Sequence, residues 1–283
     1  MTLHVSGMTV AATVLLLIIC FILPIALYYF FYKFVDGRGK VLGVGAAAFF
    51  AGGFVLEMTA QHIVYLFTDM SANIPVNLVY NFIFSPILFL VTNYIAMRFF
   101  GDQMKTTGDA LTYSTGYTGL QNMLMVGFAE LINFINLLSV NGMGSIVVVS
   151  DADYARYSDL VSASNLLSET TFNHMQNLCD RPISYLLIMC VDRLFIMAAY
   201  AAILLVVWLA VRKKGGTPLL AVALGMKIII AVPAVLGDIN VIESMWILMP
   251  MAFAATVAVW VIAIFCRKKF IDNTDVVYVR RRR

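Results

Sequence analysis

The sequence predicts an all-α fold, a polytopic transmembrane helical bundle of about seven spans. Hydrophobic residues make up 61% of the 283 residues and charged residues only 12%, against roughly 25% charged residues in an ordinary soluble domain. A soluble fold of this length has too little interior to bury so much apolar surface, so the long apolar runs must meet lipid. These runs are continuous and lack the alternation of a transmembrane β-strand, which indicates helices.

Seven apolar windows are long enough to span a bilayer, because about 20 apolar residues in a helix cross a hydrocarbon core of roughly 30 Å. They lie near residues 10–32, 41–67, 75–99, 111–138, 183–211, 219–236 and 245–266. No tandem repeat or low-complexity linker divides the chain, so residues 1–283 are predicted to form one transmembrane domain. Inside the windows, kinks are expected at four prolines, Pro24, Pro86, Pro233 and Pro250.

The basic residues predict the orientation, since Lys and Arg near span ends favour the cytoplasmic side. They gather in alternate connections and in the C-terminal tail, residues 267–283, whereas the opposite side has only Arg156 and Arg181. The N-terminus is therefore expected outside and the C-terminus in the cytoplasm, in the plasma or inner membrane of a cell. The basic tail is predicted to contact anionic lipid rather than nucleic acid.

One connection, residues 140–182, is much longer than the others and is expected outside the membrane. It carries five acidic residues, Asp151, Asp153, Asp159, Glu169 and Asp180. Loops of this length often act as lids or form surface helices. For its segment Tyr154–Leu167, a short helix at the membrane surface and an irregular structure both remain open.

Five ionisable residues lie inside predicted spans, each about nine or ten residues from the outer end of its span. They are Glu57, Glu130, Asp192, Arg193 and Lys227. This spacing predicts a charged layer near the middle of the bilayer. Two interpretations stay open: buried ion pairs that fasten the bundle, or a hydrated cavity that binds a polar substrate or peptide backbone.

The fourth span also predicts a polar stripe that faces other helices or a cavity. Its members include Asn122, Asn133 and Asn136, which fall within about 60° of one another at 100° per residue. In the third span, Asn77, Asn81 and Ser85 recur at helical spacing. In the second span, Gly43, Ala47, Ala51 and Gly52-Gly53 predict close helix contact.

The sequence contains no recognisable metal or nucleotide motif. His4, His62 and His174 are isolated, and neither a paired His/Cys spacing nor a phosphate-binding glycine loop is present. No metal ion and no cofactor is therefore expected.

Several short stretches resemble the YhfC-type membrane proteins, relatives of the CAAX-protease and PrsW-like glutamic intramembrane proteases. They are Thr115–Gln121 with Gly127, Asn133 and Asn136 after it, Val191-Asp192-Arg193, and Val211–Lys214 with Val232-Pro233-Ala234. The order and length of the spans are also similar over nearly the whole chain. The resemblance implies an intramembrane peptidase whose motifs are Gly-His-Gly-Gly-Ile-Glu, a Glu-Arg pair followed by His, and a late His-x-x-x-Asp.

The residues to which the resemblance assigns chemistry differ in this chain. The His and Glu of the first motif correspond to Tyr117 and Gln121, and the next His corresponds to Tyr200. The late His and Asp correspond to Lys227 and Ala231. In such a protease the Glu would take a proton from water and the histidines would stabilise the oxyanion. Gln121 cannot accept and return that proton.

Three function classes follow from these observations. The first is a catalytically degenerate family member that binds a membrane-spanning peptide or protein. The second is an active intramembrane endopeptidase that uses the substituted residues, with Lys227 as a base. The third is a small-solute or proton-coupled transporter that uses the charged layer, although no inverted repeat is visible.

Overall fold

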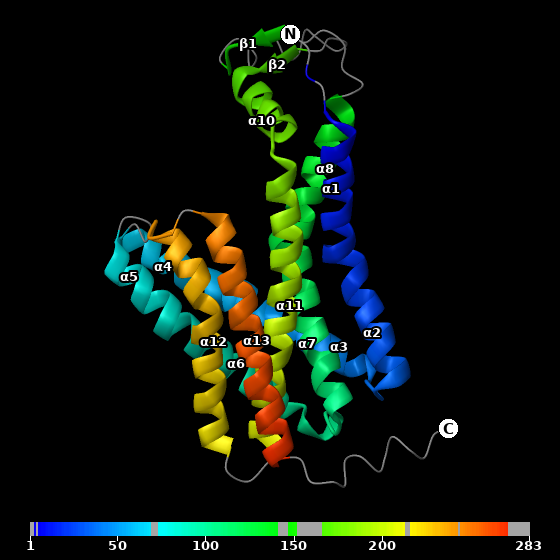
Figure 1. Ribbon diagram of the computed structural model, residues 1–283, viewed down its shortest axis with the longest axis vertical. Coiled ribbons are helices and arrows are strands. Elements are labelled where there is room, and N and C mark those ends of the chain that lie inside the picture. Colours follow the sequence, from blue (N-terminus) through cyan, green and yellow to red (C-terminus); the bar gives the residue numbers. More distant parts are fainter. Residues whose placement is uncertain are drawn as a thin grey trace.

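The structure is a computed structural model that describes residues 3, 5–68, 73–140, 147–151, 166–212, 216–242 and 244–270. The described residues form seven helices long and apolar enough to cross a membrane, which confirms the all-α, multi-pass prediction (Figure 1). These spans are Gly7–Phe34, Gly39–Phe67, Ile74–Phe99, Thr107–Val140, Ile183–Arg212, Gly216–Asp238 and Met245–Phe270. Most of the predicted segment Tyr154–Leu167 lies outside the described residues.

Each of the first four spans consists of two α-helices joined by a π-helical segment. The α-helices are α1 (Gly7–Leu17), α2 (Leu23–Phe34), α3 (Gly39–Ala48), α4 (Glu57–Phe67), α5 (Ile74–Val79), α6 (Ser85–Phe99), α7 (Thr107–Asn122) and α8 (Phe128–Val140). The π-helical segments are η1 (Ile18–Ile22), η2 (Phe49–Leu56), η3 (Tyr80–Phe84) and η5 (Met123–Gly127). A short 3₁₀ turn, η4 (Gly101–Gln103), lies between α6 and α7.

Two of the expected proline irregularities coincide with these π-helical segments. Pro24 and Pro86 lie in the first turns of α2 and α6, directly after η1 and η3. Proline lacks the N–H of the α-helical ladder and its ring crowds the carbonyl four residues earlier, so a wider turn upstream relieves the clash. Pro233 and Pro250 lie within the continuous helices α12 (Gly216–Asp238) and α13 (Met245–Phe270).

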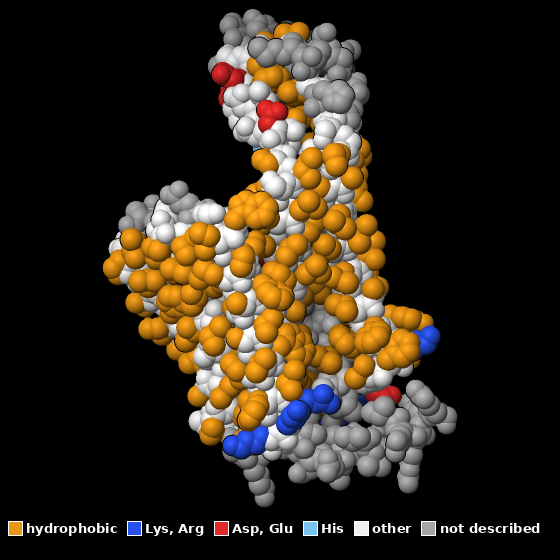
Figure 2. All heavy atoms as spheres, in the orientation of Figure 1, with side chains coloured by type: hydrophobic (Ala, Val, Ile, Leu, Met, Phe, Trp, Pro, Cys, Tyr) orange, Lys and Arg blue, Asp and Glu red, His pale blue; other side chains and the backbone are white. Residues whose placement is uncertain are grey.

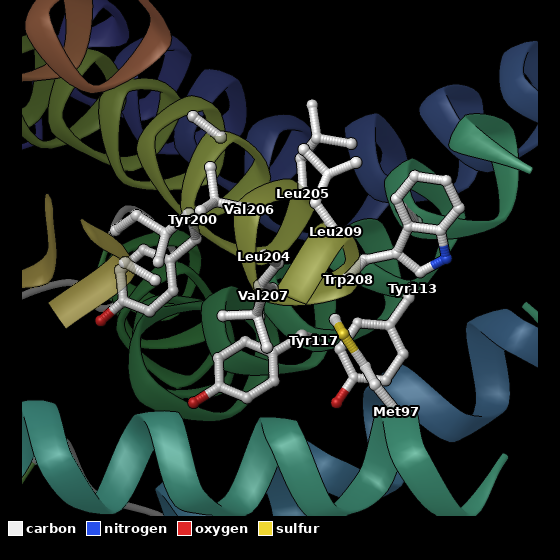
Figure 3. Close-up of a cluster of buried hydrophobic side chains, with 14 of the residues drawn as sticks. Met97, Tyr113, Tyr117, Tyr200, Leu204, Leu205, Val206, Val207, Trp208 and Leu209 are labelled. Carbon is white, nitrogen blue, oxygen red and sulfur yellow. The ribbon is translucent and has the colours of Figure 1, made fainter. Parts of the chain in front are cut away.

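The central helix is α11 (Ile183–Arg212), which packs against α1, α6, α7, α12 and α13. Its most apolar stretch is 61% buried, whereas the corresponding stretches of the other spans are 22–33% buried. Figure 3 shows Tyr113 and Tyr117 of α7 lying against α11 residues such as Val207 and Trp208. The other six spans therefore face lipid along much of their length, and apolar side chains cover most of the bundle face that Figure 2 shows.

Helices α3 and α7 approach each other closely at two glycines. A Cβ on Gly45 would lie 2.0 Å from the Tyr113 carbonyl oxygen, and one on Gly116 would lie 2.0 Å from the Leu42 carbonyl oxygen. Close contact was expected in this span, but a Cβ added to its expected member Gly43 would meet nothing within 4 Å. The contact face therefore runs through Gly45, because only a residue without a side chain lets two helix backbones meet at this distance.

One end of the bundle carries a small cap, which we call the α10 end. Here β1 (Val147–Val149) and β2 (Leu166–Ser168) pair in parallel, and α10 (Glu169–Cys179) follows (Figure 1). The side chains of Met175 and Leu178 pack with Val5, Leu137 and Val140. The cap is thus fastened to the start of the first span and to the end of α8.

Candidate functional site

A cavity of about 770 Å³ lies between α11, α12 and α13, with a further wall from α4, η3 and α6. Most of its lining is apolar, as expected inside a membrane bundle. Its polar side chains inside the bundle include Glu57, Asn81, Ser85, Asp192, Arg193, Tyr200 and Lys227. The structure therefore brings four of the five residues of the predicted charged layer, all except Glu130, around one cavity.

The cavity occupies the half of the bundle nearer the α10 end. Its lining runs from Tyr185 to Tyr200 on α11, from Lys227 to Asp238 on α12 and from Met245 to Thr256 on α13. Beyond Tyr200, residues 202–210 of α11 are all buried in the core shown in Figure 3. The cavity thus extends from these helix ends to Lys227 and Tyr200, which we call its floor.

At this floor Lys227 lies beside two aromatic rings, Tyr200, which also lines the cavity, and Phe89, and a third ring, Tyr117, packs against both of them. The Lys227 ammonium donates a hydrogen bond to the Tyr200 hydroxyl, and it lies 4.2 Å from the Tyr200 ring centroid and 5.0 Å from that of Phe89. Tyr117 stacks on Tyr200 with ring centroids 5.9 Å apart, and it meets Phe89 edge to face at 5.5 Å. Aromatic faces attract a cation, so the rings favour a charged lysine at this place.

The other charged-layer residues at the cavity, Glu57, Asp192 and Arg193, make contacts within the cavity walls. The Ser85 hydroxyl donates to the Glu57 carboxylate, and the Tyr80 hydroxyl donates to the Glu57 backbone carbonyl at 3.1 Å. Arg193 donates to Asp192 through one terminal nitrogen, while its buried Nε has no hydrogen-bond partner among the described residues. Glu57 and Asp192 therefore each already have a neighbour on their own wall.

Glu130 lies apart from the cavity and has a partner that sequence reasoning missed. Arg181, just before α11, donates to both Glu130 carboxylate oxygens at 2.9 Å, and Asn133 donates to one of them at 3.2 Å. Arg181 was assigned only to the outer side of the membrane. One feature of the sequence could have predicted this partner. Arg181 lies directly before Pro182 and the fifth span, and an arginine at the end of a span can extend its side chain into the bundle.

The polar stripe of the fourth span does not line the cavity either. Asn122 is fully buried, and neither of its amide atoms has a hydrogen-bond partner among the described residues. Asn133 and Asn136 are half-buried. In the third span, by contrast, Asn81 and Ser85 do line the cavity.

The positions that the resemblance to the family assigns to its motifs come from three helices, and several of them lie at this site. Tyr200, Lys227 and Ala231 line the cavity, and Tyr117 contacts Tyr200 directly. Gln121 follows Tyr117 by one turn of α7, and its buried Oε1 has no partner within the described part of the chain. Three of the positions that the resemblance assigns to the family motifs thus line the cavity, and a fourth, Tyr117, packs directly behind Tyr200.

The described residues contain no group of three or more His, Cys, Asp or Glu side chains that could hold a metal ion. His62 and His174 are exposed, and His4 lies outside the described residues. The side chains around the floor supply an ammonium, two phenols and an amide instead.

Comparisons with known proteins bear on the same region. No curated protein and no solved structure matches the chain. A family model described as "YhfC intramembrane metalloprotease" matches residues 19–252, which include the second half of the first span, the next five spans, the start of the seventh and every residue named at the cavity floor. The chain therefore belongs to the YhfC intramembrane metalloprotease family.

Proposed function

We propose that this family member binds a membrane-spanning peptide or protein in its cavity without cleaving it. One observation carries the proposal: Tyr200, Lys227 and Ala231, at positions that the resemblance assigns to the family motifs, line a cavity, yet Tyr200 and Lys227 form an aromatic–ammonium cluster there with Tyr117. The scaffold that would admit a peptide is kept. The side chains that would perform hydrolysis are replaced.

The family description implies a metal ion, and the residues at these positions do not fit one. Metal ions that assist hydrolysis are held by imidazole, carboxylate or thiolate groups. Tyr117, Gln121 and Lys227 supply a phenol, an amide and a positively charged ammonium, and Ala231 supplies no donor atom. An ammonium in the floor would also repel a metal cation.

A mechanism with a carboxylate base in place of a metal meets the same difficulty. Gln121 has the shape of Glu and its hydrogen-bonding capacity, but an amide does not take up and return a proton near neutral pH. A phenol ordinarily loses its proton only near pH 10, so Tyr117 and Tyr200 are weak replacements for histidine. Binding without cleavage is the function that these side chains support.

Site-specific photo-crosslinking in intact membranes tests the proposal. A photoreactive residue at Met249, which lines the cavity, is expected to form an adduct with a membrane-spanning protein that keeps its full length. The matched control is Ile247, which is on the same helix, is 53% exposed and does not line the cavity. Equal adducts from both positions, or a partner recovered as two fragments cut within its span, would contradict the proposal.

A second candidate function is an active endopeptidase, which one observation favours. The Ser85 hydroxyl donates to the Glu57 carboxylate in the same cavity as Lys227, so a nucleophile and two possible bases share the site. This candidate predicts cleavage of a spanning reporter that Ser85→Ala and Lys227→Ala both abolish. Transport receives no such support, because the inner half of α11 is packed.

A further inference from the structure

Lys227 is a cation without an anion in the part of the chain that the structure describes. The ion pairs there are Arg38–Asp109, Arg181–Glu130 and Arg193–Asp192, and Lys227 is in none of them. An ammonium has three N–H donors, and within the described residues one of them, directed at the Tyr200 hydroxyl, has a hydrogen-bond acceptor. Two donors of Lys227 are therefore free for a group that enters the cavity.

The depth of Lys227 defines where such a group must lie. Lys227 precedes Asp238, the last residue of α12, by three turns of helix, which places it roughly 17 Å from that helix end. This is about half of a hydrocarbon core roughly 30 Å thick. A partner would have to present its group near the middle of the bilayer.

The chemistry of the partner group follows from the cost of charges in lipid. An unpaired lysine and an unpaired carboxylate are both costly at the bilayer centre, and pairing lowers the cost of both. Among the described residues Lys227 makes no ion pair with Glu57 or Asp192: the Ser85 hydroxyl donates to Glu57, and Arg193 pairs with Asp192. Asp238, which also lines the cavity, lies three turns of helix from Lys227. We therefore expect the Lys227 ammonium to pair with an acid from another molecule.

Resting on the proposed function, we propose that the cavity selects a membrane-spanning partner that carries an Asp or Glu near the middle of its span. The partner's carboxylate accepts hydrogen bonds from Lys227, and its apolar neighbours lie along side chains such as Ile188, Ile196 and Met249. Tyr200 and Phe89 hold the ammonium in position before the partner arrives.

The test uses the purified full-length protein in phosphatidylcholine vesicles and two synthetic single-span peptides. Each peptide has a Leu/Ala span of about 22 residues, with either Asp or Asn at its centre. The Asp peptide is expected to bind about tenfold more tightly, an energy difference typical of one good charge pair. Lys227→Met should abolish this preference and Lys227→Arg should keep it. Lys227→Asp should instead prefer a third peptide, identical except for a central Lys.

Lys269→Met is the matched control, because Lys269 lies in the last turn of α13 and outside the cavity, so this variant should keep the preference. Equal binding of the two peptides to the intact protein, or an unchanged preference in Lys227→Met, would overturn the inference. So would a preference that disappears when the vesicles contain phosphatidylglycerol, since Lys227 would then bind a lipid headgroup. If the Lys227→Met variant does not fold, the inference is tested by the difference in binding between the Asp and Asn peptides on the unsubstituted protein.

Failure of the proposed function is distinguishable from failure of this inference. A cavity that binds both peptides equally still gives crosslinks from Met249, whereas a cavity that binds no spanning segment gives none.

Discussion

At the scale of single residues, Glu130 and Arg181 show how a charge inside the bundle is stabilised. The Glu130 side chain is 7% exposed and the Arg181 side chain 21% exposed, and Arg181 reaches both carboxylate oxygens. The guanidinium also lies 5.8 Å from the Tyr185 ring centroid. This pair ties the start of α11 to α8, so it stabilises the bundle and leaves no open charge for a ligand.

Removing one member of this pair is expected to destabilise the protein. Arg181→Gln leaves Glu130 buried without its counter-ion and should lower the free energy of unfolding by about 1–3 kcal/mol, less than for a fully buried pair because Arg181 is partly exposed. The double variant Glu130→Gln/Arg181→Gln should recover part of this loss. Unfolding in detergent measures the two single variants, Arg181→Gln and Glu130→Gln, and the double variant. Strictly additive effects would show that the two side chains do not interact.

At the scale of elements, the glycine contact between α3 and α7 sets how closely these helices pack. The close approach brings Phe49 of the second span edge to face with Tyr117, at a centroid distance of 5.3 Å. Because Tyr117 then stacks on Tyr200, the position of the cavity floor depends on this helix pair. The packing of the second span against the fourth thus affects the geometry of a site on the fifth and sixth spans.

The glycine contact predicts different changes in stability for two Gly→Ala substitutions, one inside the contact and one outside it. Gly116→Ala places a Cβ against the Leu42 backbone and should cost about 1–3 kcal/mol of stability through overpacking. Gly43→Ala has open space around it and should be neutral or stabilising by up to about 1 kcal/mol, since alanine favours a helix more than glycine. Thermal unfolding of both variants is the measurement. Equal melting temperatures would contradict the packing argument.

At the scale of the whole molecule, the charges separate along the long axis of the bundle. In Figure 2, Lys and Arg side chains gather at the end opposite the α10 end, where α13 finishes with Arg267, Lys268 and Lys269. The cavity lies in the half of the bundle nearer the α10 end. If the basic end faces the cytoplasm, as the sequence predicts, partners reach the cavity from the outer half of the bilayer.

Cysteine labelling tests this orientation. In a cysteine-free variant, His174→Cys on α10 should react with a membrane-impermeant maleimide added to intact cells. Asp102→Cys, in the turn between α6 and α7, should react only after the membrane is opened. The reverse pattern would show that the protein is inserted with its N-terminus inside.

The sequence by itself determined the fold class, the seven spans and the family. These properties depend on local composition, because a long apolar run must become a helix in lipid wherever its neighbours lie. Glu57, Asp192, Arg193 and Lys227 also stood out without a structure, since an ionisable residue inside a span is costly and therefore rare.

The tertiary structure alone decided which of these residues share a site. Glu130 has the same sequence signature as Glu57, yet it pairs with Arg181 while Glu57 lines the cavity with Lys227. Depth along a helix can be counted from the sequence, but the direction of a side chain depends on how the helices pack. Here that packing depends on contacts such as Gly45 with Tyr113 and Gly116 with Leu42, which join residues far apart in the chain.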